Sequence, residues 1–228
     1  MAPQKSGPKP PKALHLLRAT VHAPGKFQQT SRKGQETYVA KLKIDSSQEW
    51  LEAVLTDFDA FLLDHAGCER KASAMALSLI SHYPDRVVLV QEMMVLAREE
   101  LEHFHQMLWL TQAKGLVLQP AEKDLYVQSL RSHVRRGTDE YFLDRLLVAG
   151  IIEMRGCERF GLVANALDPG PLQLFYQEIA RTESRHGGLF YRLARRYFDP
   201  AEATERQEQL LEYEAQIVDS LPIRPVVH

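Results

Sequence analysis

Two short segments of this 228-residue chain repeat one pattern of acidic and histidine residues. Residues 97–103, AREELEH, align with residues 180–186, ARTESRH. Each segment places a histidine three residues after a glutamate, which gives the pairs Glu100 with His103 and Glu183 with His186. On an α-helix these positions share one face about a turn apart, so both side chains of a pair can reach one cation.

A second repeat adds one more glutamate to each pair. The sequence Gly-Cys-Glu-Arg occurs at residues 67–70 and again at 156–159, and it contributes Glu69 and Glu158. The order Glu, then Glu-x-x-His, therefore occurs twice, as expected for two helical hairpins that repeat one structural unit. Burying four carboxylates together without counter-ions is prohibitively costly, so the pattern predicts two divalent cations.

The predicted metal site is dinuclear and lies inside a four-helix bundle. Carboxylate and imidazole ligands suit iron or manganese, and the absence of thiolate ligands argues against zinc or an iron–sulfur cluster. One glutamate from each of two helices and Glu-x-x-His from the other two is the arrangement of ferritin-like proteins. We expect Glu100 and Glu183 to bridge the metals. The six predicted ligands are Glu69, Glu100, His103, Glu158, Glu183 and His186.

Several neighbouring residues are weaker candidates for a role as ligands or as supporting residues of the site. Glu102 and His105 form a competing Glu-x-x-His pair, but they lack a counterpart in the second segment. Glu99 is a candidate to orient a ligand histidine from the opposite helix. Asp64 and His65 precede Glu69 by about one turn and are candidates for the same supporting role, or simply polar positions on the helix. The alternative for the whole pattern is a plain bundle with charged faces.

The elements that position these residues are predicted to be long helices. Pro84, Gly115 and the Asp168-Pro169-Gly170 turn divide the chain into segments typical of an antiparallel bundle, and Ser46 with Glu49 reads as a helix-capping box. We therefore predict an all-α fold, a ferritin-like four-helix bundle with extra helices. The expected helices cover 57–82, 85–114, 122–134, 138–168, 171–198 and 201–220.

The first 45 residues differ from the rest of the chain. Residues 1–43 contain nine lysines and arginines against the single acidic residue Glu36, although the whole chain has a net charge of −2. We predict an irregular, partly disordered basic extension over 1–45 and the di-iron helical domain over 46–228. Such a basic arm is a candidate contact for phosphate or another polyanion. The alternative is a solvated leader segment without a binding role. With no membrane span and no signal-peptide core, a cytoplasmic protein is expected.

The amino-acid sequence around the predicted ligands resembles one known family. Residues 63–72, LDHAGCERKA, residues 96–104, LAREELEHF, and residues 150–160, GIIEMRGCERF, are similar to the MiaE family. Residues 183–186, ESRH, fit the same pattern. The resemblance covers most of the chain from about Trp50 to Tyr197. The MiaE family consists of tRNA hydroxylases that act on 2-methylthio-N6-isopentenyladenosine beside the anticodon.

The resemblance implies an iron-dependent monooxygenase. Its cofactors would be two iron ions, with O2 as co-substrate, and tRNA would be its partner. Electrons would come from a separate electron-transfer protein or reductase, because the sequence has no Cys-x-x-Cys and no Gly-x-Gly-x-x-Gly. A ferritin-like ferroxidase or iron-storage protein is the alternative, and an RNA-binding helical protein without catalysis is another. The candidate tRNA contacts are Arg131, Arg135, Arg136, Arg192, Arg195 and Arg196.

Overall fold

The computed structural model describes residues 41–120 and 123–228, and all regular structure in these ranges is helical. The predicted all-α class is therefore confirmed, and each predicted helix is found within three residues of its expected ends. The helices are α1 (Gln48–Thr56), α2 (Phe58–His82), α3 (Val87–Ala113), α4 (Leu125–Ser132), α5 (Thr138–Ala166), α6 (Pro171–Tyr197) and α7 (Pro200–Ser220).

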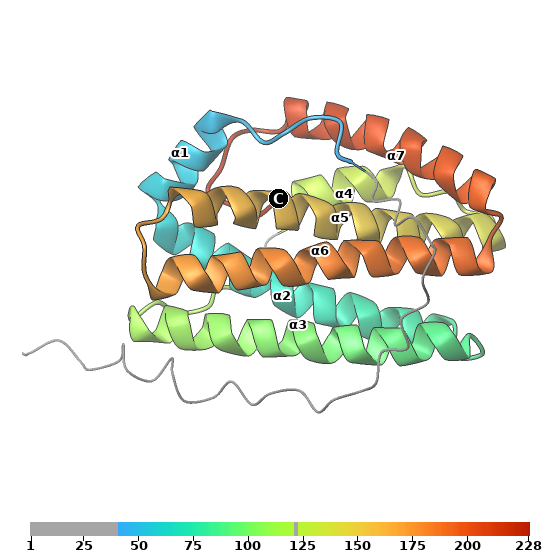
Figure 1. Cartoon of the computed structure of the whole chain (residues 1–228), viewed down its shortest axis with the longest axis horizontal. Helices are drawn as coiled ribbons and strands as arrows, with labels where there is room; N and C mark the ends of the chain where they lie inside the picture. Colours follow the sequence, from blue (N-terminus) through green and yellow to red (C-terminus); the bar gives the residue numbers. More distant parts are fainter. Residues whose placement is uncertain (1–40, 121–122) are drawn as a thin grey trace, which may run out of the picture. The chain divides into compact units, whose positions relative to one another are not determined.

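The four long helices α2, α3, α5 and α6 run alongside one another as a bundle (Figure 1). The bundle consists of two hairpins, since α2 packs along α3 and α5 packs along α6. Four residues, 83–86, connect the first hairpin, and four residues, 167–170, connect the second. Pro171 occupies the first turn of α6, where a missing N–H group costs no helical hydrogen bond. Equal connections make the two hairpins nearly equivalent.

The bundle interior contains two apolar clusters with a polar layer between them. One cluster includes Ala76, Leu96 and Ile151 and extends toward the 83–86 connection. The other includes Ala66 and Met107 and continues toward the opposite end of the bundle. The predicted ligands of α2, α3 and α6 fall in sequence between the members of these clusters, so the apolar side chains above and below keep water away from them.

Helices α4 and α7 cover the outer side of α5, and two buried ion pairs join α5 to α7. Arg155 of α5 is fully buried and its Nε donates to Glu214 of α7 at 2.8 Å. Asp144 of α5 is also buried and accepts from Arg206 of α7 at 2.8 Å. These pairs fix α7 against the bundle, because an unpaired charge at such a position is strongly destabilising.

The N-terminal cap of α1 differs from the prediction by one residue. The hydroxyl of Ser47, and not that of Ser46, accepts the Trp50 N–H at 3.2 Å. Of the predicted basic extension, residues 1–40 lie outside the described residues, and 41–45 approach α1 without regular structure. Among the described helices, none combines the length and the apolar character needed to cross a membrane.

Candidate metal centre

Six buried side chains from the four bundle helices converge in the polar layer. Their ligand atoms form two overlapping groups, and within each group the atoms all lie within 4.8 Å of one another. Glu100 and Glu183 belong to both groups. Glu69 and His103 complete the first group, and Glu153 and His186 complete the second. We call this set the Glu/His cluster: Glu69, Glu100, His103, Glu153, Glu183 and His186.

Both histidines of the cluster turn Nδ1 toward the carboxylates. Nδ1 of His186 lies 2.7 Å from Oε1 of Glu100, and Nδ1 of His103 lies 3.4 Å from Oε2 of Glu69 and 3.6 Å from Oε1 of Glu183. These contacts have the distances of ion pairs but not the geometry of hydrogen bonds. Among the described residues, four of these buried atoms make no hydrogen bond: Oε1 of Glu100, Oε1 of Glu183 and Nδ1 of each histidine. Buried polar atoms are rarely left without a partner, so their convergence fits cations bound between them.

The electrostatics of the cluster support the same interpretation. Burial raises the pKa of Glu153 well above its usual value, and the nearby Glu183 and Glu100 carboxylates raise it further. Burial also raises the pKa of Glu100. For His103, burial favours the neutral ring, but the adjacent carboxylates of Glu100 and Glu69 outweigh it and bring its pKa to about 10. Protons thus neutralise the metal-free cluster, and divalent cations would displace them.

The structure brings five of the six predicted ligands together but not the sixth. Glu158 lies outside the cluster, and Glu153 of the same helix lies in it instead. One oxygen of Glu158 accepts the Ser46 N–H at 2.8 Å. The other accepts the Ser46 hydroxyl at 2.8 Å and Nη1 of Arg155 at 3.0 Å. Glu153 and Glu158 are five residues apart, which separates them by about 140° around a helix. The two cannot share one face, so Glu158 points away from the bundle interior.

Distance from the hairpin connection is a sequence signal that favours Glu153 without deciding which way its side chain faces. In an antiparallel hairpin, residues equally far from the connection lie opposite one another. Glu69 is 13 residues before the end of α2, and Glu100 is 13 residues after the start of α3. Glu153 is likewise 13 residues before the end of α5, and Glu183 is 12 after the start of α6. The repeated Gly-Cys-Glu-Arg sequence instead favoured Glu158, which is only eight residues from the end of α5.

Two of the three predicted supporting residues contact the cluster. Glu99 lies 2.8 Å from Nε2 of His186, the ring nitrogen opposite Nδ1. His65 is fully buried, and its Nε2 lies 2.5 Å from Oε1 of Glu69 while its Nδ1 lies 3.3 Å from the Tyr176 hydroxyl. Asp64 instead accepts the Val227 N–H at 2.7 Å, so it holds the last segment of the chain rather than a ligand.

A cavity of about 610 Å³ reaches the Glu/His cluster from the side of α4 and α5. Carboxylates of the cluster, among them Glu69 and Glu153, line its inner part. Apolar side chains such as Met75, Val148 and Ile152 also line it, and three arginines, Arg131, Arg136 and Arg145, complete its wall. The cavity therefore joins the carboxylates of the Glu/His cluster to cationic groups.

Comparison with known proteins decides the family. A family model described as tRNA-(MS2IO6A)-hydroxylase (MiaE) matches residues 35–228. The chain belongs to the MiaE family. It is 37% identical over 171 residues to the tRNA 2-(methylsulfanyl)-N(6)-isopentenyladenosine(37) hydroxylase of Pseudomonas putida. The aligned region covers 75% of this chain and 83% of that protein. The enzyme of the same name from Salmonella typhimurium is 32% identical over 126 residues, 50% of this chain and 46% of that protein.

A solved structure extends the comparison from sequence to fold. Protein 43 with aldehyde deformylating oxygenase activity, from Synechococcus, superposes with a TM-score of 0.78 at 34% identity. The match covers 83% of this MiaE-family chain and 96% of the Synechococcus chain. The bundle is therefore ferritin-like, as the order of the ligand-type residues predicted.

The structure divides the arginines proposed as tRNA contacts of this MiaE-family chain. Arg131 and Arg136 line the cavity. Arg135 has a structural role, because its Nη2 donates to the buried Asp144 at 2.8 Å. The cluster of Arg192, Arg195 and Arg196 is not part of the cavity wall, and its role in tRNA binding stays a prediction.

Arg145 is a cavity residue that sequence reasoning missed. Its guanidinium lies between the rings of Tyr83 and Tyr141, 5.7 Å from each ring centre. Nη2 donates to the Ser78 hydroxyl at 3.2 Å, but the buried Nη1 has no hydrogen-bond partner among the described residues. No carboxylate in the described ranges forms an ion pair with it. The sequence does not single out Arg145, because its hydrogen-bond partner Ser78 lies on α2 and the other cavity residues come from several elements.

Proposed function

We propose that this chain hydroxylates the isopentenyl group of 2-methylthio-N6-isopentenyladenosine in tRNA, since its relatives are named hydroxylases of this nucleoside. The observation that carries the proposal is the cavity in which the Glu/His cluster and three arginines meet. The cluster provides a site for oxygen chemistry, and the arginines provide donors for a nucleotide phosphate.

We further propose that the Glu/His cluster binds two iron ions. Glu69 and His103 would hold one ion and Glu153 and His186 the other, and Glu100 and Glu183 would be available to both, because these two carboxylates belong to both groups. Iron held there in its reduced form would supply the activation of O2. One oxygen atom enters an allylic methyl group as a hydroxyl, and the other leaves as water. This balance needs two protons and two electrons, and we propose that a separate donor protein supplies the electrons.

The chain's own residues would position the substrate and exclude water. The isopentenyl group is apolar and suits the part of the cavity lined by Met75, Val148 and Ile152, next to Glu153. A phosphate of the same nucleotide suits the arginine side, where Arg145 has an unused donor. The layers of apolar side chains on both sides of the cluster protect the reacting methyl group from competing water.

The basic residues at the start of the chain fit the same proposal. We propose that 46–228 forms the catalytic domain and that the extension 1–45 contributes to tRNA binding through its nine lysines and arginines. Removing residues 1–34, which precede the family match, should weaken tRNA binding at low salt while leaving the iron content at two per chain.

The likeness to the Synechococcus protein makes aldehyde deformylation a second candidate function. A fatty aldehyde would use the apolar part of the cavity but would leave the buried donor of Arg145 without an anion. The two candidates share the proposed iron site, so metal content does not separate them. Products must be compared directly.

The deciding experiment is nucleoside analysis after reaction. The purified chain, loaded with ferrous iron, is given O2, a reducing system and tRNA from cells that lack the hydroxylase. We expect conversion of 2-methylthio-N6-isopentenyladenosine to a product heavier by one oxygen atom, labelled when 18O2 is supplied. A parallel reaction with a long-chain aldehyde should yield no alkane. Alkane without tRNA product would reject the hydroxylase, and binding of far more than two irons per chain would favour storage.

A further inference from the structure

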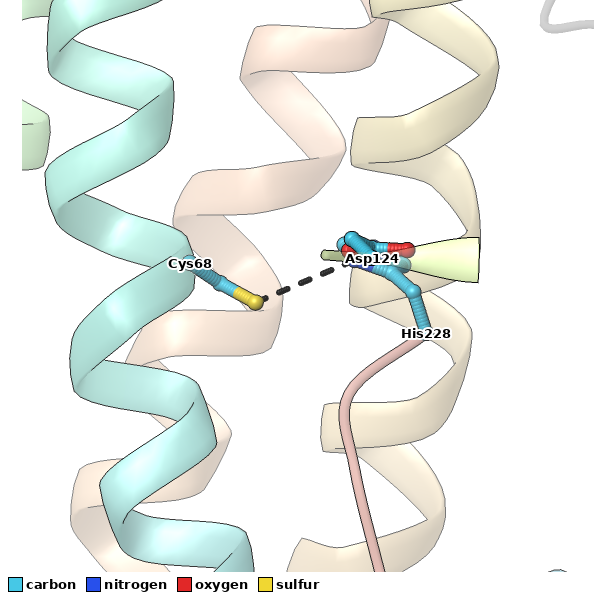
Figure 2. Close-up of side chains that lie close together, drawn as sticks. All are labelled: Cys68, Asp124 and His228. Carbon is cyan, nitrogen blue, oxygen red and sulfur yellow. Dashed lines mark hydrogen bonds and ion pairs between the residues drawn. The ribbon is translucent and has the colours of Figure 1, made fainter. Parts of the chain in front are cut away.

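A second group of metal-ligand side chains lies beside the Glu/His cluster but outside it. It consists of Cys68 on α2, Asp124 just before α4, and His228 at the end of the segment that follows α7 (Figure 2). One ligand atom from each residue lies within 4.8 Å of the other two. The three residues are far apart in the sequence, so only the tertiary structure brings them together.

The distances within this group suit a small cation. Sγ of Cys68 lies 3.9 Å from Nδ1 of His228, and the same nitrogen lies 3.4 Å from Oδ2 of Asp124. In a tetrahedral zinc site, Zn–S and Zn–N/O bond lengths place the ligand atoms roughly 3.3–3.7 Å apart. The contact between Asp124 and His228 already has this length, and the contact between Cys68 and His228 would need to shorten by a few tenths of an ångström.

Each ligand side chain is oriented by other contacts. The Cys68 thiol donates to Oδ2 of Asp64 at 3.7 Å. Oδ1 of Asp124 accepts the Val127 N–H at 2.9 Å as the cap of α4, which leaves Oδ2 directed at His228. The His228 ring stacks on Tyr126 with centres 5.2 Å apart, and its side chain is only 7% exposed. The preceding residue, Val227, donates its N–H to Asp64 at 2.7 Å. Preoriented ligands of this kind are typical of metal sites.

We propose that Cys68, Asp124 and His228 bind one Zn²⁺ ion. The combination of thiolate, imidazole and carboxylate matches zinc, whereas the thiolate-free Glu/His cluster suits iron. Binding converts the Cys68 thiol to a thiolate and releases its proton to solvent. Asp124 and His228 also line two cavities, of about 610 and 650 Å³, so water can reach a fourth coordination position.

The zinc site would fasten one wall of the substrate cavity. It links α2, the start of α4 and the final segment, and each of its three ligands lines the 610 Å³ cavity. Without the ion, the segment is already joined to its neighbours by the pair between Asp124 and His228 and by the bond from Val227 to Asp64. The Val226 and Val227 carbonyls also accept from Trp50 and Arg159. Zinc would add a direct link from this segment to α2 through Cys68.

Cobalt binding to the full chain tests the site, because only a cysteine ligand gives the near-ultraviolet thiolate-to-cobalt charge-transfer band. The chain is first loaded with ferrous iron without oxygen and then titrated with Co²⁺. We expect a band that saturates at one equivalent and disappears when Zn²⁺ is added. Cys68→Ser should abolish the band, and His228→Ala should weaken cobalt binding at least ten-fold, both with unchanged helix content and iron content.

Cys157 provides the matched control. It occupies the position equivalent to Cys68 in the second Gly-Cys-Glu-Arg repeat, but its thiol donates to the Ala180 carbonyl at 3.2 Å. Cys157→Ser should therefore keep the full band. The proposal is overturned if the folded, iron-loaded parent shows no band, if the band survives Cys68→Ser, if His228→Ala leaves binding unchanged, or if Cys157→Ser removes the band. None of these results depends on tRNA hydroxylation.

Discussion

His186 is held between two glutamates that follow one another on α3. Its Nδ1 lies 2.7 Å from Glu100 inside the Glu/His cluster, and its Nε2 lies 2.8 Å from Glu99 outside it. A carboxylate behind a ligand histidine fixes the ring orientation and strengthens its basicity. The position equivalent to Glu99 in the second hairpin is Thr182, whose hydroxyl donates to the Glu178 carbonyl, so the two halves of the site are supported differently.

Glu99→Ala should weaken one of the two iron sites more than the other. Loss of a supporting carboxylate typically lowers metal affinity 10–100-fold. An anaerobic ferrous titration should therefore show one equivalent bound as in the parent and the second bound more weakly. Thr182→Val serves as the control and should leave both equivalents unchanged. Equal weakening of both sites by Glu99→Ala would contradict the asymmetry described here.

Glu153→Ala and Glu158→Ala form a matched pair on one helix. Glu153→Ala should reduce bound iron from two per chain to one or none and abolish hydroxylation, because it removes a carboxylate of the cluster. Glu158→Ala should keep two irons and lose roughly 1–3 kcal/mol of stability, because Ser46 and Arg155 lose an acceptor. Iron analysis and urea unfolding measure both effects. The reverse pattern would restore Glu158 as a ligand.

Glu100→Ala should separate the stability of the metal-free chain from that of the iron-bound chain. Without metal, Glu100 is a buried acid that faces similar groups, so its removal should leave the melting temperature equal to or above that of the parent. With ferrous iron, the parent should gain stability that the variant lacks, since metal binding contributes folding free energy. Anaerobic thermal melts with and without iron give the comparison. Full iron stabilisation of the variant would remove Glu100 from the ligand set.

Arg145→Ala should weaken tRNA binding through loss of a buried donor. A hydrogen bond to a charged group contributes about 1.5–3 kcal/mol, so affinity should fall roughly ten-fold or more. The slope of the logarithm of affinity against the logarithm of salt concentration should also decrease in magnitude by about one, because one fewer counter-ion is released. Arg195→Ala, on a residue outside the cavity wall, should have a smaller effect. An unchanged salt dependence for Arg145→Ala would exclude a phosphate contact.

Asp144 should make the unfolding free energy of the chain depend on pH. Burial alone would raise its pKa, but the hydrogen bonds from Arg206 and Arg135 outweigh burial and hold the pKa below its usual value. The carboxylate therefore contributes stability above the unfolded pKa of about 3.9, and this contribution is lost as pH falls through the lower folded pKa. Asp144→Asn should lose about 3–5 kcal/mol near neutrality.

Urea unfolding at several pH values measures this contribution. The difference in unfolding free energy between the parent and Asp144→Asn should be largest near neutrality and should shrink below about pH 4. Glu140→Gln, at an exposed position of the same helix, is the control and should show no such convergence. A difference that stays constant down to the acid transition would mean that packing, rather than charge, stabilises Asp144.

The sequence alone determined those features that depend on neighbours along one helix. The pairs Glu100 with His103 and Glu183 with His186 follow from a three-residue spacing that places both side chains on one helical face. Helix ends follow from local residues such as Pro84 and the turn before Pro171. These features, with the family resemblance, were sufficient for the bundle, the convergence of glutamate and histidine side chains inside it and the expected hydroxylase family.

Only the tertiary structure decided which residues meet across helices. Glu153 and Glu158 lie on the same helix within similar sequence, and the packing of α5 against α6 determines which of them faces inward. Tertiary packing also brings Arg145 of α5 to the cavity, and it joins Cys68 of α2 to Asp124 and His228. Local spacing fixes the angle between two side chains of one helix, but the rotation of that helix against its partners depends on all the apolar contacts of the core together.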